Sequence, residues 1–257
     1  MRTGTGLPSV EGMNTQAPTA VVTGASRGLG FALADALAEA GYHLVIDARN
    51  PVALETAAAR LASSHGWRVT PVAGDIADPA HRAALAAAAS EFGGASLLIN
   101  NAGTLGVSPL PALADYPADE LLAALETNVV APIALTQLLL PDLRRLGGAV
   151  LCVTSDAAVE PYAGWGGYGA AKAGLEQACN VLAAEESAVR VWWVDPGDLR
   201  TQMHQDAFPG EDISDRPLPE SVTPAFLHLI SERLPSGRYR AAELRSARVP
   251  TPAGGGA

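Results

Sequence analysis

Short apolar runs alternate along this chain with longer segments that are rich in Ala and Leu. The runs are four to seven residues long, which suits strands, and the longer segments space their apolar side chains as helices do. Such alternation is typical of βαβ units, whose parallel strands are buried on both faces. We expect strands near residues 20–23, 43–47, 69–73, 96–100, 149–154 and 189–195, and a closing strand near 237–241.

The segments between these runs predict the helices. We expect them near residues 29–40, 52–63, 79–92, 118–146, 168–186 and 222–234. Right-handed crossovers then give an α/β fold with a single, doubly wound parallel sheet of the Rossmann type and helices on both faces. Ligands of such sheets bind beyond the carboxyl ends of the strands, so polar residues just after each strand are the candidates for function.

Length and composition indicate one domain. The chain has 257 residues, 48% of them hydrophobic and 17% charged, which suits one large α/β domain near residues 18–248. The termini, residues 1–17 and 249–257, lack periodicity, and we expect them to be disordered tails.

Charge and hydropathy indicate which kinds of partner the protein lacks and in which cellular compartment we expect it. A net charge of −10 argues against nucleic acid or an anionic membrane surface as a partner. We see no apolar run of membrane-spanning length and no signal peptide, and we expect a cytoplasmic protein. Cys152 and Cys179 are predicted to be buried free thiols, and no cysteine or histidine cluster has the spacing of a metal site.

A glycine-rich turn follows the first predicted strand. The segment Thr23-Gly-Ala-Ser-Arg-Gly-Leu-Gly30 carries three glycines and opens a helix. Glycines let a backbone approach a pyrophosphate, which the positive end of the helix attracts. The alternative is a strand-to-helix turn that needs glycine for packing alone.

The second strand ends in two residues with opposite implications for a dinucleotide. A carboxylate such as Asp47 accepts hydrogen bonds from ribose hydroxyls and favours NAD, whereas a guanidinium such as Arg49 pairs with a 2′-phosphate and favours NADP. The spacing alone leaves both open.

Polar residues after the next two strands have two interpretations each. Asp75 either accepts from an adenine amino group or caps the helix that begins at Pro79. The segment Asn100-Asn-Ala-Gly103 either lets a ribose approach or forms a plain turn. Asn128, within an apolar helix, is either a satisfied core residue or part of a polar relay.

The clearest catalytic candidates are Ser155, Tyr168 and Lys172. Tyr168 and Lys172 are four residues apart at the start of a predicted helix, which places them on one face. The ammonium is then expected to favour the phenolate and lower the pKa of Tyr168, so that the phenol exchanges a proton with a substrate oxygen. A solvated helix face is the alternative. Lys172 is the only lysine among the 17 basic residues, which favours a specific role.

Together these residues resemble the short-chain dehydrogenase/reductase family over roughly residues 18–205. The resemblance rests on their order and spacing: Thr23-Gly-x-x-x-Gly-x-Gly30, Asp75, Asn101-Ala-Gly103, Asn128, Ser155, Tyr168-x-x-x-Lys172 and Pro196-Gly197 leading to Thr201.

The resemblance implies hydride transfer between a nicotinamide and a carbonyl or secondary alcohol of a small, partly apolar substrate. Tyr168 would be the general acid/base, Lys172 would lower its pKa and hold the nicotinamide ribose, and Ser155 would bond the substrate oxygen. Asn128 would fix a water that links Lys172 to the solvent. The cofactor would be bound by Gly24, Ser26, Arg27, Gly28, Leu29, Gly30, Arg49, Asp75, Ile76, Asn101, Ala102, Gly103, Lys172, Pro196, Gly197 and Thr201.

The same resemblance favours NADP(H) over NAD(H). The carboxylate of NAD-dependent relatives usually falls where this chain has Ala48, and NADP-dependent relatives carry arginines like Arg49 and Arg27. It also implies a homodimer or homotetramer.

Several questions stay open at this level. Residues 198–220 form the variable substrate-binding region of the family, and the Pro-rich, acidic part at 208–219 is typical of a lid. Asp156 is either a tuning residue or an exposed cap, and Trp165 is either a wall of the pocket or a packing residue. A cofactor-binding sensor without turnover, or an isomerase or dehydratase on the same fold, are the alternative functions.

Overall fold

The apolar runs pair as parallel strands of one sheet in the computed structural model, which describes residues 17–246. The predicted tails, residues 1–17 and 249–257, lie outside this range except for Ala17. The strands are β1 (Thr19–Val22), β2 (His43–Ala48), β3 (Val69–Ala73), β4 (Leu97–Asn100), β5 (Ala149–Val153), β6 (Arg190–Asp195) and β7 (Gly237–Arg240). Their order across the sheet is β3-β2-β1-β4-β5-β6-β7, and every pair is parallel. This confirms the predicted fold class.

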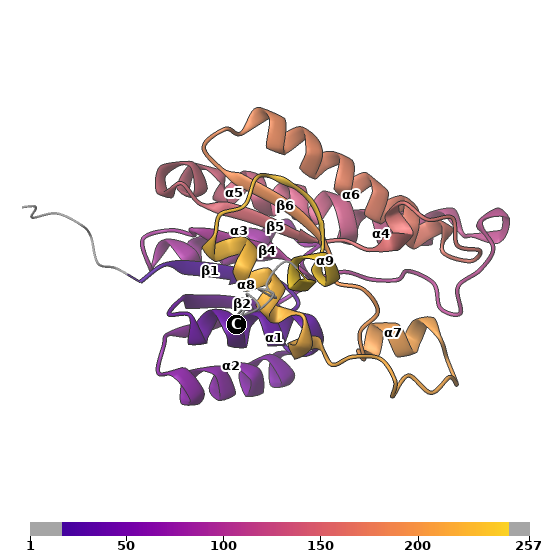
Figure 1. Ribbon diagram of the computed structural model, residues 1–257, viewed down its shortest axis with the longest axis horizontal. Coiled ribbons are helices and arrows are strands. Elements are labelled where there is room, and N and C mark those ends of the chain that lie inside the picture. The colour runs from indigo at the N-terminus through magenta and orange to yellow at the C-terminus, as the bar shows by residue number, and fades with distance from the viewer. Residues whose placement is uncertain (1–16, 247–257) are drawn as a thin grey trace, which may run out of the picture.

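Helices cover both faces of the sheet (Figure 1). The longer ones are α1 (Gly28–Glu39), α2 (Pro51–His65), α3 (Pro79–Ser90), α4 (Ala118–Leu125), α5 (Ala131–Leu146), α6 (Gly166–Glu185) and α8 (Thr223–Ser231). Two short helices are α7 (Gln202–Ala207) and α9 (Ala241–Ser246), and single 3₁₀ turns form at Leu113–Asp115, Asp156–Ala158 and Pro219–Ser221. In Figure 1, α1, α2 and α8 lie on one side of the sheet, and α5 and α6 lie on the other.

The alternation of side chains along each strand divides the core into two layers. In β1, Ala20 and Val22 pack into the layer that faces α1, α2 and α8, whereas Val21 packs into the layer that faces α3, α5 and α6. Successive residues of a strand point to opposite faces, so a strand buried on both sides is apolar throughout. Cys152 and Cys179 lie in the second layer as buried free thiols, as expected.

Local signals in the sequence set the ends of the helices on the sheet. Asn50 and Asp78 cap α2 and α3 with their side chains, and each is followed by proline at the first helical position. Gly66 ends α2 and Gly147 ends α5 with a positive φ, which glycine adopts without strain. Because Asp78 is the cap of α3, the interpretation of Asp75 as that cap is wrong.

The stretch predicted as one helix over 118–146 is divided in three. A π-helical segment, Glu126–Val130, separates α4 from α5, and the amide of Ala131 donates to the carbonyl of Glu126, five residues earlier. The next residue, Pro132, has no N–H group and cannot donate the hydrogen bond of a regular α-helix. Such widened turns concentrate at functional sites, and this one contains Asn128.

The expectation that no segment reaches membrane-spanning length needs a correction. The continuous helical stretch Ala118–Leu146 has 29 residues and is long and apolar enough to cross a membrane by length and composition. Its most apolar window is 33% buried, and core helices of soluble proteins pass the same test.

Candidate functional site

A cleft of about 1670 Å³ opens at the carboxyl ends of the strands. It lies where the chain, having built β1, β2 and β3 outward, crosses back to place β4 on the other side of β1. This reversal is the usual ligand site of an open parallel sheet. The volume exceeds the 300–1,000 Å³ that is typical for one drug-sized ligand, so a dinucleotide and a small substrate fit together.

Most of the predicted residues line this one cleft. They are Gly24, Ser26, Arg27, Gly28, Leu29, Gly30, Arg49, Asp75, Ile76, Asn101, Ala102, Gly103, Ser155, Lys172, Pro196, Gly197 and Thr201. The two exceptions, Asn128 and Tyr168, are buried, and they contact Thr104 and Leu105, which do line the cleft.

The glycine loop is shaped for close approach by a ligand. Gly24 and Gly28 have φ values of +67° and +60°, which disfavour any side chain. Gly30 has a different requirement, because a Cβ there would lie 2.4 Å from the carbonyl oxygen of Gly24. A Cβ on Gly24 would lie 3.0 Å from Cα of Ala102 and from Nδ2 of Asn101, so packing accounts in part for Gly24 as well as for Gly30. Packing does not account for Gly28, where the nearest atom would be 3.7 Å away.

The structure contradicts the interpretation of Asp47 as a ribose ligand. Its side chain is only 2% exposed, and both carboxylate oxygens are occupied. Oδ1 accepts from the backbone N–H of Gly24 at 2.6 Å, and Oδ2 contacts Nε2 of His81 at 3.0 Å. Asp47 and His81 thus hold the start of the glycine loop from beneath. Asp47, Ala48 and Arg49 all border the cleft, but the carboxylate of Asp47 is turned to the loop and to α3 rather than to the open space.

Two arginines border the end of the cleft beside β2, and neither has a side-chain partner among the described residues. Arg27 precedes α1 and Arg49 follows β2, and both are exposed. Within residues 17–246, neither guanidinium takes part in a hydrogen bond or ion pair. Unpaired guanidinium groups at this place are suited to a phosphate.

The turn after β3 and the segment after β4 complete this half of the cleft. Asp75 accepts from the N–H of Ala77 at 2.9 Å, which closes a tight turn and leaves Asp75 and Ile76 on the cleft wall. Asn101 donates to the carbonyl oxygens of Thr23 and Gly24, at 2.9 and 3.2 Å, and so joins the glycine loop to β4. Ala102 and Gly103 are small enough to leave the cleft open.

Asn128 is a satisfied core residue that fixes the loop beside Lys172. Its Oδ1 accepts from the N–H of Thr104 at 2.9 Å, and its Nδ2 donates to the carbonyl of the same residue at 2.8 Å. A Cβ on Gly103 would lie 2.9 Å from that Oδ1 and 3.7 Å from Nζ of Lys172, so the three residues are in close contact.

Ser155, Tyr168 and Lys172 meet where β5 ends and α6 begins. Nζ of Lys172 donates to the carbonyl of Val153 at 2.8 Å and lies 5.6 Å from the centroid of the Tyr168 ring. The Ser155 side chain lies close enough to the Tyr168 phenol to lower its pKa. The predicted proximity of the three groups is therefore observed.

The electrostatics of the phenol differ from the expectation. Burial raises the pKa of Tyr168 well above its usual value, and the neighbouring Ser155 only partly opposes this. Burial also lowers the pKa of Lys172 to about 8. Desolvation disfavours the charged form of both groups and is the largest influence on each, so the predicted lowering of the pKa of Tyr168 is wrong for this structure.

Residues far apart in sequence cover the phenol, and the sequence analysis missed most of them. Tyr168 packs against Leu105, Ala157, Trp165 and Met203 of α7. Trp165 meets the phenol edge to face, with ring centroids 5.7 Å apart, and it also contacts Phe208. Trp165 therefore walls the pocket and packs within it, so both interpretations hold.

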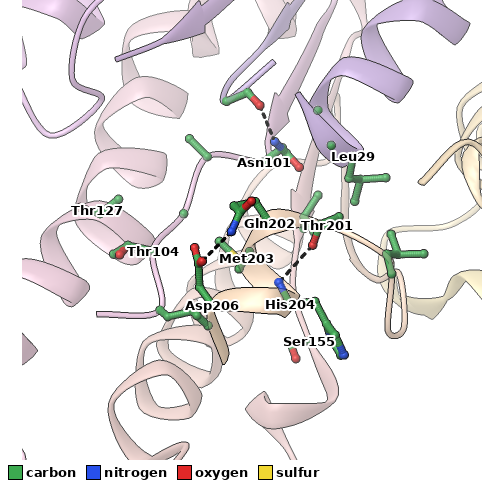
Figure 2. A pocket seen from close by; sticks show the side chains of 18 of the residues that line it. Leu29, Asn101, Thr104, Thr127, Ser155, Thr201, Gln202, Met203, His204 and Asp206 are labelled. Carbon is green, nitrogen blue, oxygen red and sulfur yellow. Dashed lines mark hydrogen bonds between the residues drawn. The ribbon is translucent and has the colours of Figure 1, made fainter. Parts of the chain in front are cut away.

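The predicted variable region, residues 198–220, begins with the helix α7, which lines the cleft and ends just before the segment 208–219 that was predicted as a lid. Figure 2 shows Gln202 bonded to Asp206 along α7, with His204 bonded to Thr201 at its start. The hydroxyl of Ser108 donates to the carbonyl of Asp206 at 2.7 Å, which ties α7 to the loop after β4. Loop 104–110 was not singled out, although its position directly after Asn101-Ala-Gly103 was a usable signal.

Comparison with known proteins agrees with this geometry. The model of the short chain dehydrogenase family matches residues 18–212. Sepiapterin reductase of Meriones unguiculatus is 38% identical over 197 residues, which covers 72% of this chain and 75% of the relative.

Two solved structures share the fold closely. One is an alcohol dehydrogenase of Thermococcus sibiricus in complex with 5-hydroxy-NADP, with a TM-score of 0.79, 27% identity and coverage of 87% of this chain and 95% of the other. The second is L-sorbose reductase of Gluconobacter frateurii in complex with NADPH and L-sorbose, with a TM-score of 0.77, 30% identity and coverage of 88% and 94%. With its parallel sheet, its glycine loop and the cluster of Ser155, Tyr168 and Lys172, the chain belongs to the short-chain dehydrogenase/reductase family of oxidoreductases.

Proposed function

We propose that this protein is an NADP(H)-dependent carbonyl reductase or alcohol dehydrogenase. The observation that carries the proposal is the meeting of Ser155, Tyr168 and Lys172 at one end of a cleft whose other end has two unpaired arginines. The cofactor would supply or accept a hydride at its nicotinamide ring. The residues of the chain would bind it, orient the substrate and move one proton.

The dinucleotide would lie along the cleft. The open floor at Gly24 and Gly28 and the start of α1 would hold its pyrophosphate, because backbone N–H groups and the helix dipole attract anions there. Asp75 and Ile76 would border the adenine, and Asn101, Ala102 and Gly103 would border the adjoining ribose. Pro196, Gly197 and Thr201 would border the nicotinamide, with Lys172 at its ribose.

The phenol of Tyr168 would exchange the proton with the substrate oxygen. In reduction, the O–H of Tyr168 would donate its proton to the carbonyl oxygen of the substrate, which becomes negatively charged as the carbon receives the hydride. In oxidation, the phenolate would accept the proton from the alcohol. Ser155 lines the cleft and lies close enough to the phenol to lower its pKa, so it would hold the substrate oxygen next to Tyr168. The lining by Leu105, Trp165, Met203 and Phe208 favours a partly apolar ketone or alcohol.

Preference for NADP(H) follows from the charges at the adenosine end. Asp47 is buried and fully bonded, so it presents no carboxylate to a ribose hydroxyl, whereas Arg27 and Arg49 are free to pair with a 2′-phosphate. The relatives complexed with NADPH and with 5-hydroxy-NADP support this choice.

A fluorescence titration with NADPH and NADH tests the coenzyme. The Arg49→Ala variant should weaken NADPH binding about 10- to 100-fold, as expected for one charge-assisted contact, and leave NADH binding unchanged. Arg60→Ala is the matched control, because Arg60 is exposed on α2, stacks on Phe31 and does not line the cleft. Equal losses for both coenzymes, or a wild-type preference for NADH, would contradict the assignment.

A further inference from the structure

The carboxylate of Asp156 lies against the catalytic serine. Oγ of Ser155 is 3.0 Å from Oδ1 of Asp156 and accepts from the N–H of Ala157 at 3.2 Å. An ionised carboxylate only accepts hydrogen bonds, and a serine hydroxyl has a single proton. The proton of Ser155 therefore points to Asp156.

This arrangement limits what Ser155 can offer to the neighbouring phenol, whose pKa the serine lowers. While its proton is on the Asp156 side, the serine oxygen presents only a lone pair to Tyr168 and does not donate to a phenolate. A phenolate would instead need the serine to donate to it, and the serine would have to release Asp156. Asp156 thus competes with the phenolate for the same proton.

Asp156 is itself held in place. The hydroxyl of Tyr162 donates to Oδ2 of Asp156 at 3.0 Å, and this contact is the main reason why the pKa of Tyr162 is raised. Both oxygens of the carboxylate are therefore engaged, one by the serine and one by the tyrosine, and its orientation is fixed although it lies at the edge of the cleft.

The other charges near the phenol come from four directions. Asp195 at the end of β6 raises the pKa of Tyr168, as Asp156 does. Lys172 of α6 lies 5.6 Å from the ring centroid, and Glu160 and Asp198 lie near Tyr162. The guanidinium of Arg238 in β7 donates to the carbonyl of Ser155 at 3.2 Å, but its charge is matched by Glu176 at 3.0 Å. None of these other groups contacts the hydroxyl of Ser155, whereas Asp156 accepts a hydrogen bond from it.

We propose that Asp156 is a positioning residue that orients the Ser155 hydroxyl and keeps Tyr168 in its proton-donating form. The inference rests on the proposed function, since it concerns the same proton. It means that the site is set for carbonyl reduction near neutral pH, and that alcohol oxidation with the same residues requires a higher pH.

The test is the pH profile of alcohol oxidation in the Asp156→Asn variant. The amide has nearly the same shape but carries no charge, so the rising limb of kcat/KM should move down by about one pH unit. Oxidation at pH 7 should then increase several-fold relative to reduction. Asp156→Glu should move the limb back toward the wild-type position.

Glu160→Gln is the matched control, because it removes one charge from the same loop but does not line the cleft. Its profile should coincide with that of the wild type. An unmoved limb in Asp156→Asn, or an equal shift in Glu160→Gln, would overturn the role of Asp156.

A second readout does not depend on turnover. The protein is labelled with ¹³C at Cζ of its tyrosines, and the NMR resonance of Tyr168 is identified as the one that is absent from Tyr168→Phe. The pH at which this resonance begins to shift should be lower in Asp156→Asn than in the wild type. If this shift occurs but no carbonyl is reduced, the proposed function fails and the positioning role stands. If carbonyls are reduced but neither the resonance nor the limb moves, the positioning role fails alone.

Discussion

At the scale of single residues, burial controls the chemistry of the site more than pairing does. Tyr168 and Lys172 are both buried, and each is shifted toward its neutral form. An ammonium whose pKa is about 8 is mostly charged near neutral pH, but it loses its charge as the pH rises through 8 rather than through its usual range. The helical spacing of four correctly predicted that the two groups are neighbours, but spacing carries no information on how much solvent reaches them.

This leads to a prediction on the pH dependence of reduction. The pKa of Lys172 is depressed from its ordinary 10.5 to about 8, so the folded protein loses this charge as pH rises through about 8. We expect kcat/KM for carbonyl reduction to fall in the same range, because this quantity reports the groups of the free enzyme. In Lys172→Arg, which stays charged, the descending limb should disappear while the maximal rate drops at least 10-fold, on the order expected for a wide fork in a tight site. A descending limb that persists unchanged in Lys172→Arg would assign it to another group.

The same residues show what the sequence does not contain. The sequence left open whether Asp47 binds a ribose of NAD or Arg49 binds the 2′-phosphate of NADP. Only the fold shows that His81 and the amide of Gly24 contact the carboxylate of Asp47. The contacts of Asp156 with Ser155 and Tyr162 are local, but the sequence alone does not show which side chains these two residues bond. A partner distant in sequence, His81, decided the role of Asp47.

At the scale of elements, strands were predicted well and the long helix was not. Strand boundaries agree within two residues because most strands are short, mainly apolar runs between polar turns; β7, with the sequence Gly-Arg-Tyr-Arg, is the exception. The break at Glu126–Val130 is a subtle change in hydrogen bonding, and hydropathy does not detect it. Helix α7 is short and lies in a polar region, so no periodic pattern predicted it.

The glycine loop allows a sharp test at this scale. A Cβ on Gly30 would press against the backbone of Gly24, so Gly30→Ala should displace the loop, destabilise the fold by about 1–3 kcal/mol and weaken NADPH binding. Gly174→Ala is the control, because the nearest atom to its Cβ would be 3.6 Å away in the middle of α6. Thermal unfolding and coenzyme titration measure both effects, and equal behaviour of the two variants would show that the loop tolerates the side chain.

At the scale of the whole molecule, the long helices leave apolar side chains uncovered. Val130, Ile133 and Leu138 on the stretch from the π-helical segment through α5, and Val181 on α6, are exposed. We propose that this face pairs with a second copy in a homodimer or homotetramer. Light scattering should give a mass at least twice that of one chain, and Ile133→Glu should lower it. A single-chain mass for the wild type at micromolar concentration would contradict the assembly.

The central claim is that Tyr168 moves the proton in an NADPH-dependent reduction. The most direct measurement compares turnover and NADPH binding in the wild type and in Tyr168→Phe, with product mass recorded over a panel of partly apolar ketones. We predict a product two mass units heavier than the substrate for the wild type, and a loss of at least 100-fold in turnover for the variant, as expected when a general acid is removed. NADPH binding should stay within about two-fold, because the cofactor would be held by the glycine loop, Arg49 and Lys172 rather than by the phenol. Unchanged turnover in Tyr168→Phe, or a product of unchanged mass, would contradict the account.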